Sequence, residues 1–360
     1  MNPQDEKSEF SLSERRYNER RAEIKKAKKR QALIRLLLRA AILLVAIIVA
    51  ISLIVSSCDE DASDASLSQS DVSFSQSGGD GAESNSSQSA AQNIKLPTAA
   101  ADMKTPAEIN SHYVAILDCE KGEIIASKGM HERMYPASLT KIMTLLVAVE
   151  ENEDLEKKFT VTNAIIDPLY RAEATLAGFL DGEEVRLLDL LYGTVLPSGA
   201  EAAECTAIMT AGSVEDFVAL MNKKAKELGL TNTHFANVTG LHDKNNYSTA
   251  YDMAVILSAA LEHDVCRKIM ETYQYTTAPT NKHPQGIPLT STIFSYMYGT
   301  EPEGADIKGG KTGYTDQSGY CIAAFGESDG GREYIVITAK GDSRWPAVYD
   351  QINLFTKYAK

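Results

Sequence analysis

Apolar segments of strand length occur near both ends of the folded part of the sequence. The segments 113–118 (YVAILD) and 123–127 (EIIAS) flank a short polar turn and predict a β-hairpin. Near the C-terminus, three further apolar segments are separated by Gly, Asp and Ser residues typical of turns. These three predicted strands cover 306–315, 319–327 and 333–340.

Between these strands the sequence has helical patterns. An apolar segment follows Ser138, and the segment 213–229 begins with the capping pair Ser213 and Asp216 and ends at a glycine. The segment 248–263 is largely apolar after its first hydroxyl residues, which predicts a central helix, and a last helix is expected from about 345 to 358. Strands at both ends with helices between them predict an α+β domain, whose antiparallel sheet pairs the first strands with the last.

The N-terminal region has a different pattern. Residues 40–58 are 19 consecutive residues without a charge, long enough to span a bilayer. Residues 1–39 carry 12 Lys or Arg against 6 Asp or Glu, so the positive-inside rule places them in the cytoplasm and the following chain outside. We interpret 40–58 as an uncleaved transmembrane signal anchor. A buried core helix, a cleaved signal peptide and a lipoprotein cleavage box that would lipidate Cys58 are the alternatives.

Residues 59–100 are rich in Ser, Asp, Gln and Gly and contain few large apolar residues. Such a composition cannot bury enough surface to offset the entropy of ordering, so this segment is expected to be a disordered linker. The predicted organisation is therefore a cytoplasmic segment (1–39), a membrane anchor (40–58), the linker and a folded domain over 101–360.

The net charge and the spacing of the histidines and cysteines argue against several classes of function. The net charge of −13 argues against a nucleic-acid partner. Six histidines occur without metal-site spacing, and the five cysteines contain no Cys-x-x-Cys pair. The sequence therefore gives no indication of a metal site or a disulfide framework.

One short motif carries a candidate reaction. Ser138 and Lys141 are three residues apart, so on a helix their side chains share one face. A desolvated lysine can accept the proton of a serine nucleophile. A helix-capping serine beside a solvated lysine is the structural alternative, and the spacing alone does not exclude it.

A second candidate feature is the segment Lys311-Thr312-Gly313 on a predicted strand. Gly309, Gly310 and Gly313 leave room for another backbone, so a peptide could pair with this strand while Lys311 and Thr312 contact its terminal carboxylate. A glycine-rich hairpin end with an exposed lysine is the alternative.

Four blocks together resemble the low-molecular-mass D-alanyl-D-alanine carboxypeptidases, which are penicillin-binding serine peptidases of the bacterial cell wall. The blocks are PASLTKIMT, LPSGAEAA, NVTGLHDKNNYSTAYDMA and IKGGKTGYTDQSGYC, in that order. The resemblance implies a DD-peptidase-like fold with an all-helical subdomain, stem peptides of peptidoglycan as substrates, β-lactams as inhibitors, and a role in peptidoglycan biosynthesis and cell shape. It implies no cofactor.

The resemblance also implies roles for single residues. Ser138 matches the acylated nucleophile, Lys141 its base, and Ser198 the serine that helps to protonate the leaving amine. Lys311, Thr312 and Gly313 match the substrate-binding motif, and the backbone N–H groups of Ser138 and Tyr314 match the oxyanion hole.

The chain departs from the family pattern at the second motif, which reads Ser198-Gly199-Ala200 where the family has asparagine at the third position. This departure keeps open a second function class, a wall-peptide-binding pseudoenzyme without catalysis. A serine β-lactamase is the third alternative, but the chain lacks the Glu-x-x-Leu-Asn stretch that supplies the deacylating base.

Overall fold

The structure is a computed structural model that describes residues 96–297 and 299–360. The predicted cytoplasmic segment 1–39, the predicted anchor 40–58 and most of the predicted linker 59–100 lie outside the described residues. Within the described ranges, no helix has the length and apolar content needed to cross a membrane.

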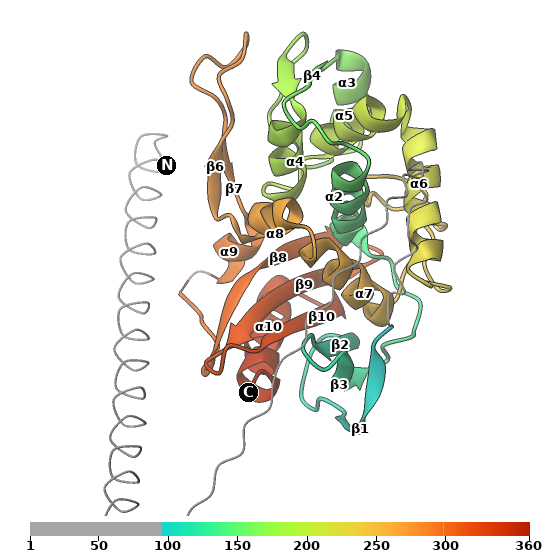
Figure 1. Ribbon diagram of the computed structural model, residues 1–360, viewed down its shortest axis with the longest axis vertical. Coiled ribbons are helices and arrows are strands. Elements are labelled where there is room, and N and C mark those ends of the chain that lie inside the picture. Colours follow the sequence, from blue (N-terminus) through green and yellow to red (C-terminus); the bar gives the residue numbers. More distant parts are fainter. Residues whose placement is uncertain (1–95, 298) are drawn as a thin grey trace, which may run out of the picture. The chain divides into compact units, whose positions relative to one another are not determined.

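Six strands form the main sheet (Figure 1). They are β1 (Thr98–Lys104), β2 (Tyr113–Asp118), β3 (Glu123–Lys128), β8 (Ala305–Thr315), β9 (Gly319–Ser328) and β10 (Glu333–Gly341). Their order in the sheet is β1-β3-β2-β10-β9-β8, and every neighbouring pair is antiparallel except β1 with β3.

The predicted pairing of the first strands with the last is confirmed. β2 lies beside β10 with Ile116 opposite Val336, so two segments from opposite ends of the domain meet at the centre of the sheet. β1 was not predicted, and it begins at Thr98, slightly before the expected domain start at residue 101. Its residues are nearly all exposed, so it lacks the apolar alternation that identifies a half-buried strand.

Helices cover both faces of the sheet. On one face, α10 (Arg344–Tyr358) contributes Gln351, whose Nε2 donates to the carbonyl of Val336 and to Thr338 Oγ1. On the other face, Ile335 and Ile337 belong to the same apolar cluster as α7 (Ala250–Leu261). The central strands are therefore buried on both sides, as their almost uninterrupted apolar sequences require.

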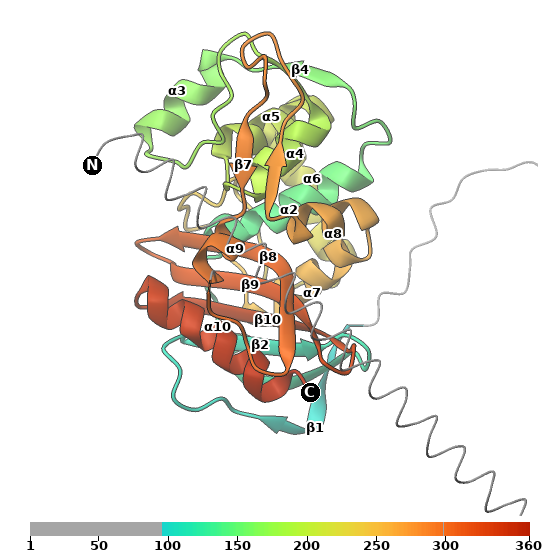
Figure 2. The ribbon, with the colours of Figure 1, turned by 90° about the vertical axis from the view of Figure 1, so that its left-hand side faces the viewer.

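The remaining helices and two short ribbons form the rest of the domain, and Figure 2 shows most of them above the sheet. The helices are α2 (Thr140–Glu150), α3 (Asn163–Arg171), α4 (Leu187–Val195), α5 (Ala200–Ala211), α6 (Val214–Glu227), α8 (Asp264–Glu271) and α9 (Thr292–Met297). The ribbons pair β4 (Lys158–Thr160) with β5 (Glu184–Arg186), and β6 (Gln274–Thr276) with β7 (Pro288–Thr290). The observed architecture is an α+β fold with an antiparallel-rich sheet.

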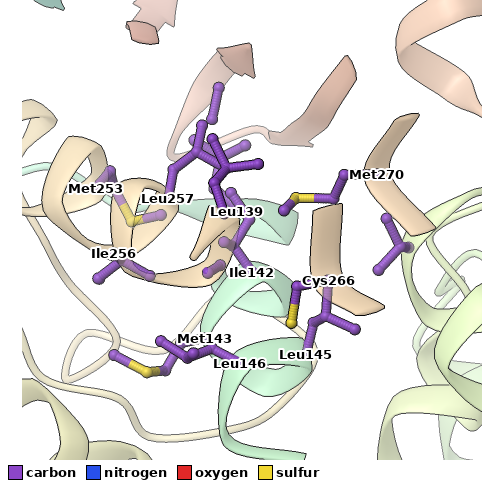
Figure 3. Packing of buried hydrophobic residues seen from close by; sticks show 14 of the residues in the cluster. Leu139, Ile142, Met143, Leu145, Leu146, Met253, Ile256, Leu257, Cys266 and Met270 are labelled. Carbon is purple, nitrogen blue, oxygen red and sulfur yellow. The ribbon is translucent and has the colours of Figure 1, made fainter. Parts of the chain in front are cut away.

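Helix α2 forms the centre of this packing (Figure 3). It is buried over nearly its whole length: most of its side chains are apolar, and its polar residues Thr140, Lys141 and Thr144 hydrogen-bond to the segment 238–246. Leu139, at its N-cap, and its own residues Ile142, Met143, Leu145 and Leu146 share one apolar cluster with Met253, Ile256 and Leu257 of α7 and with Cys266 and Met270 of α8. The first turn of α2, which carries Lys141, is thus held on several sides.

Candidate active site

Ser138 lies in a single 3-10 turn, η1 (Ala137–Leu139), directly before α2. The N-cap residue of α2 is Leu139, so the Ser138 hydroxyl does not cap this helix, and the structural alternative for Ser138 is wrong. The preceding residue, Ala137, has a φ of +47°, a left-handed conformation that costs about 1 kcal/mol or more for a residue with a Cβ. Gly240 packs so tightly against it that a Cβ there would lie 1.9 Å from the carbonyl oxygen of Ala137. The turn that presents Ser138 is therefore fixed by its surroundings.

Lys141 lies one helical turn after Ser138 and is 2% exposed. Its Nζ lies 3.3 Å from Ser138 Oγ and donates to the carbonyl of Thr239 at 2.5 Å. Burial lowers the pKa of Lys141 to about 7, although the nearby carboxyl group of Glu201 opposes this shift. A substantial fraction of Lys141 is therefore neutral near pH 7, and a neutral amine can accept a proton from the adjacent hydroxyl.

Lys311 is a second buried lysine, 1% exposed, on β8. Its Nζ donates to the carbonyl of Thr312 at 2.8 Å. Burial, followed by the charge of Lys141, lowers the pKa of Lys311 well below its ordinary value. The charge of Lys141 therefore acts on Lys311, and because Lys311 is buried, the alternative of an exposed lysine at a hairpin end is wrong.

Ser198 lies just before α5 and is 8% exposed, with a φ of +69°. Its Oγ is buried and has no hydrogen-bond partner within residues 96–297 and 299–360. A buried hydroxyl without a partner is costly in a folded protein unless a ligand or water satisfies it. This hydroxyl is thus available to a molecule that enters the site.

A cavity of about 490 Å³ brings these motifs together. Ser138, Ser198, Thr312, Gly313 and Tyr314 all contribute to its wall, so five of the seven predicted site residues surround one space. Lys141 and Lys311 are not on the wall but lie behind it, where burial holds their pKa values down.

Gly313 explains how strand β8 approaches the nucleophile. A Cβ at this position would lie 2.9 Å from the backbone nitrogen of Ser138, so only glycine permits this approach. The next residue, Tyr314, is 51% exposed at the mouth of the cavity. This packing brings the backbone of β8 against the turn that carries Ser138.

The departure at Ala200 lies in a closely packed region. Ala200 is 2% exposed at the first position of α5, and its N–H donates to the carbonyl of Thr175 at 2.8 Å. The following residue, Glu201, is fully buried, and its Oε1 accepts the N–H groups of residues 177–179. Burial raises the pKa of the Glu201 carboxyl group. Glu201 thus ties the segment after α3 to the second motif.

Sequence reasoning missed several residues of the cavity wall. Arg344, the first residue of α10, lies with its guanidinium carbon 5.0 Å from the ring centre of Tyr296. Thr292 Oγ1 lies 2.8 Å from Thr312 Oγ1, within hydrogen-bond distance. These residues belong to no short motif, and only the turn from β9 to β10 and the start of α10 bring Arg344 to the site. A search for cations near the ends of predicted strands could have found Arg344.

The comparisons with known proteins agree with this arrangement. Residues 99–341 match the peptidase S11 family, described as D-alanyl-D-alanine carboxypeptidase. The chain is 33% identical over 228 residues to the D-alanyl-D-alanine carboxypeptidase DacF of Bacillus subtilis, which covers 62% of this chain and 55% of that protein. The corresponding match to DacC of Escherichia coli is 33% identical over 259 residues, 68% of this chain and 61% of that protein. The chain therefore spans only a little over half the length of these relatives.

Solved structures extend the agreement to the fold. The crystal structure of the Streptomyces K15 DD-transpeptidase matches with a TM-score of 0.63 at 29% identity, over 71% of this chain and 99% of that chain. Penicillin binding protein 5 from Haemophilus influenzae matches with a TM-score of 0.62 at 27% identity, over 70% of this chain and 71% of that chain. Since the family match covers more than half of the sequence and includes every motif of the cavity, this chain belongs to the D-alanyl-D-alanine carboxypeptidase family of serine peptidases.

Proposed function

We propose that this protein is a cell-wall D-alanyl-D-alanine carboxypeptidase that removes the terminal D-alanine from peptidoglycan stem peptides. One observation carries the proposal: the buried Lys141 amine, whose pKa is lowered to about 7, lies 3.3 Å from Ser138 Oγ at a cavity. This pair supplies an activated nucleophile without a histidine. The match to the D-alanyl-D-alanine carboxypeptidase family supports the choice of substrate.

The acylation step begins with neutral Lys141. Its Nζ takes the proton of Ser138 Oγ, and the oxygen attacks the carbonyl carbon of the terminal D-Ala-D-Ala peptide bond. The negative charge that develops on the carbonyl oxygen is stabilised by the backbone N–H groups of Ser138 and Tyr314. Thr239 keeps the lysine side chain in place, because its carbonyl oxygen accepts a hydrogen bond from the same Nζ.

The terminal carboxylate of the substrate can be bound by a cationic side chain together with a hydroxyl donor. Arg344 and Thr312 lie on the cavity wall and offer both groups, and a guanidinium can bind a carboxylate through two parallel hydrogen bonds. Lys311 lies behind the wall, where its depressed pKa reduces its positive charge. We therefore assign the carboxylate chiefly to Arg344 and Thr312.

The C–N bond then breaks, and the departing D-alanine must receive a proton on its amine. Ser198 Oγ lies at the cavity and has no partner among the described residues, so it can relay the proton that Lys141 accepted. The products of this half-reaction are free D-alanine and an ester of Ser138. Water then attacks the ester, with Lys141 again as the base, and releases the shortened peptide.

The experiment that tests this proposal detects the covalent ester on Ser138. The purified full-length protein is incubated with penicillin, and its intact mass is measured beside D-alanine release from a pentapeptide ending in D-Ala-D-Ala. We expect an adduct in the wild-type protein that is absent from Ser138→Ala, together with release of D-alanine. Wild-type acylation rates in Lys141→Ala would overturn the role of Lys141.

Ala200 favours a second candidate function, a wall-peptide-binding pseudoenzyme. Its position provides no amide to contact the substrate backbone, whereas the family pattern has asparagine there. A penicillin adduct without D-alanine release would support this candidate, and release of D-alanine would exclude it. Rapid turnover of nitrocefin would instead favour a β-lactamase.

The site of action is part of the proposal. The uncharged segment 40–58, with its basic flank, is proposed to anchor the protein as a single-pass membrane protein with the catalytic domain outside the cell membrane. Such an arrangement would give the domain access to the peptidoglycan. Lipidation of Cys58 would tether the domain to the same face.

A further inference from the structure

The proposed reaction creates a positive charge on a buried amine. Lys141 is 2% exposed, and it becomes an ammonium when it takes the proton of Ser138. A buried charge without a partner is costly, because little water reaches it. The neighbouring buried group, Lys311, is itself basic and cannot supply a compensating negative charge. An anion that faces Lys141 would therefore stabilise the state in which the proton has been transferred.

The Lys141 ammonium also has more hydrogen-bond donors than there are acceptors around it. An ammonium has three N–H groups. Within residues 96–297 and 299–360, two acceptors lie within hydrogen-bond distance of Nζ, namely Ser138 Oγ at 3.3 Å and the carbonyl oxygen of Thr239. The third N–H group therefore has no protein acceptor in the described part of the chain.

Glu201 is a buried carboxyl group of which one oxygen is left unpaired. It is the second residue of α5 and is fully buried. Its Oε1 accepts the N–H groups of residues 177–179, whereas its Oε2 is buried and has no partner among the described residues. An unpaired buried acceptor is costly, so this second oxygen is available to a donor or to a positive charge.

The surroundings of Glu201 affect its charge in two directions. Burial raises the pKa of its carboxyl group, but the N–H groups on Oε1 lower it, and the start of a helix also favours an anion. Cys205, one turn later on α5, is another titratable group near Glu201, and burial raises the pKa of its thiol so that it stays uncharged. Hydrogen bonds and the helix terminus therefore favour the carboxylate against the effect of burial.

Glu201 and Lys141 lie on two helices that pack against each other. Ala203 and Ala207 of α5 belong to the same apolar cluster as Leu145 of α2. Burial lowers the pKa of Lys141 to about 7, and the charge of Glu201 opposes this shift. In the described part of the chain the two groups form no direct hydrogen bond, so Glu201 acts on the amine through its charge.

We propose that Glu201 is the positioning residue of the base, because its carboxylate is the counter-charge of the Lys141 ammonium that forms during acylation. This inference rests on the proposed function, in which Lys141 takes the proton of Ser138. Glu201 is not on the cavity wall, so it acts through Lys141 and not on the substrate. Its neighbour Ala200 has no polar side chain that could take this role. The second motif thus contributes Ser198 to the cavity and Glu201 to the base behind it.

The test measures how the acylation rate depends on pH in two matched variants. Glu201→Gln keeps an oxygen for the N–H groups of residues 177–179 but removes the charge. Glu204→Gln is the control, because Glu204 is a half-buried carboxyl group one turn further along α5 and is not among the described groups that act on the pKa of Lys141. For each full-length protein, the rate constant of acylation by excess penicillin is measured from about pH 5 to pH 9.

We expect the midpoint of the Glu201→Gln profile to lie about one pH unit below that of the wild type, because Lys141 loses the charge that favours its protonated form. Above the midpoint the rate should fall about three- to tenfold, since a weaker base accepts the proton of Ser138 less readily. Glu204→Gln should keep the wild-type midpoint and rate. A merely structural role of Glu201 would not move the midpoint, because with excess penicillin the observed rate constant does not depend on the amount of folded protein.

A conservative variant separates the charge of Glu201 from the length of its side chain. Glu201→Asp keeps the charge and should keep a midpoint close to that of the wild type, even where its melting temperature is lower. If Glu201→Gln gives no folded protein, Glu201→Asn is compared with Glu201→Asp, because these two variants have side chains of the same length and differ in charge. Equal midpoints in the wild type and Glu201→Gln, or in the aspartate and asparagine variants, would overturn the proposal.

The same measurements separate this inference from the proposed function. Acylation of the wild type without release of D-alanine would count against the carboxypeptidase, whereas the midpoints would still test Glu201. A wild-type protein that does not react with penicillin at Ser138 would overturn both. Normal acylation and D-alanine release with the same midpoint in every variant would overturn the role of Glu201 alone.

Discussion

Gly313 and Ser138 approach each other so closely that a methyl group on Gly313 would lie 2.9 Å from the backbone nitrogen of Ser138. Gly313 is on strand β8 and Ser138 is on the turn before α2, so this contact joins the sheet to the helical part of the domain. The contact also determines how far the two proposed oxyanion donors stand from a substrate carbonyl.

A Gly313→Ala substitution should therefore reduce acylation. The methyl group would separate the strand from the turn and displace the donor at Tyr314, and removal of one oxyanion donor costs about 10²- to 10³-fold in rate. The measurement is the second-order rate constant of penicillin acylation by stopped-flow or gel labelling. Gly330→Ala is the control, because the nearest atom to a Cβ there is at 3.5 Å. An unchanged rate in Gly313→Ala would contradict the role of this contact.

The pH dependence of acylation should follow Lys141. Burial lowers the pKa of this lysine to about 7, so below that pH the amine is charged and cannot accept the Ser138 proton. The acylation rate of the wild-type protein should therefore rise between pH 5.5 and 8.5 with a midpoint near 7. General-base catalysis typically contributes about 10²- to 10⁴-fold, so Lys141→Ala should be slower by that order and lose this rise. A flat wild-type profile would exclude Lys141 as the base.

The same lowered pKa has a consequence for stability. The unfolded lysine has its ordinary pKa of 10.5, so between about pH 7 and 10.5 the unfolded chain binds more protons than the folded protein. The free energy of unfolding should therefore gain a favourable contribution from Lys141 as pH rises through this window. In Lys141→Met this contribution should disappear, and urea titrations of both proteins at pH 7 and pH 9.5 would measure the difference. Equal pH dependences in the two proteins would show that burial does not shift this pKa.

Glu201 should stabilise the fold through its hydrogen bonds to the segment 177–179. Its Oε1 accepts the N–H groups of Ala177, Gly178 and Phe179, and each buried donor left without a partner costs about 1–3 kcal/mol. Glu201→Ala should lower the melting temperature markedly, whereas Glu201→Gln keeps a carbonyl oxygen and should lower it less. The exposed Glu153→Ala is the control in thermal melts. Equal melting temperatures for the alanine and glutamine variants would argue against these hydrogen bonds.

The substitution Ala200→Asn, which introduces the residue of the family pattern, should destabilise the folded protein. Ala200 is 2% exposed and packs with apolar neighbours at the start of α5, so an asparagine there must displace them and bury an amide. We expect Ala200→Asn to lose about 1–3 kcal/mol of stability and to change the acylation rate. Urea unfolding and penicillin acylation measured on the same preparation would separate the two effects. Ala200→Ser serves as the comparison, because serine is smaller than asparagine. An unfolding free energy equal to that of the wild type would show that the pocket accommodates the amide.

The sequence predicted the central elements well because their signals are local. The apolar strand segments and the capping pair Ser213 and Asp216 both appear in the structure, where the Ser213 hydroxyl accepts the N–H of Asp216. The proximity of Ser138 and Lys141 also followed from their spacing on one helical face. These features need no knowledge of the rest of the chain.

Features that depend on distant parts of the chain were missed. Arg344 reaches the cavity only because β9 and β10 return the chain to the nucleophile, and no residue next to it marks that position. The ribbons of β4 with β5 and of β6 with β7 have strands of three residues, too short for a period of two to be recognised. The burial of Lys311 likewise results from the packing of β8, since its local sequence is rich in glycine and polar residues.

The pairing of β2 with β10 also has a consequence for biosynthesis. The nucleophile is translated early, but the strand that supports the centre of the sheet, and the arginine that follows it, are translated only near the end. Contacts this far apart in sequence form late, because a long loop must close first. A nascent chain that stops before β10 would hold Ser138 and Lys141 without Arg344 and without the centre of the sheet. Reaction with penicillin would therefore report that a chain has been finished and folded.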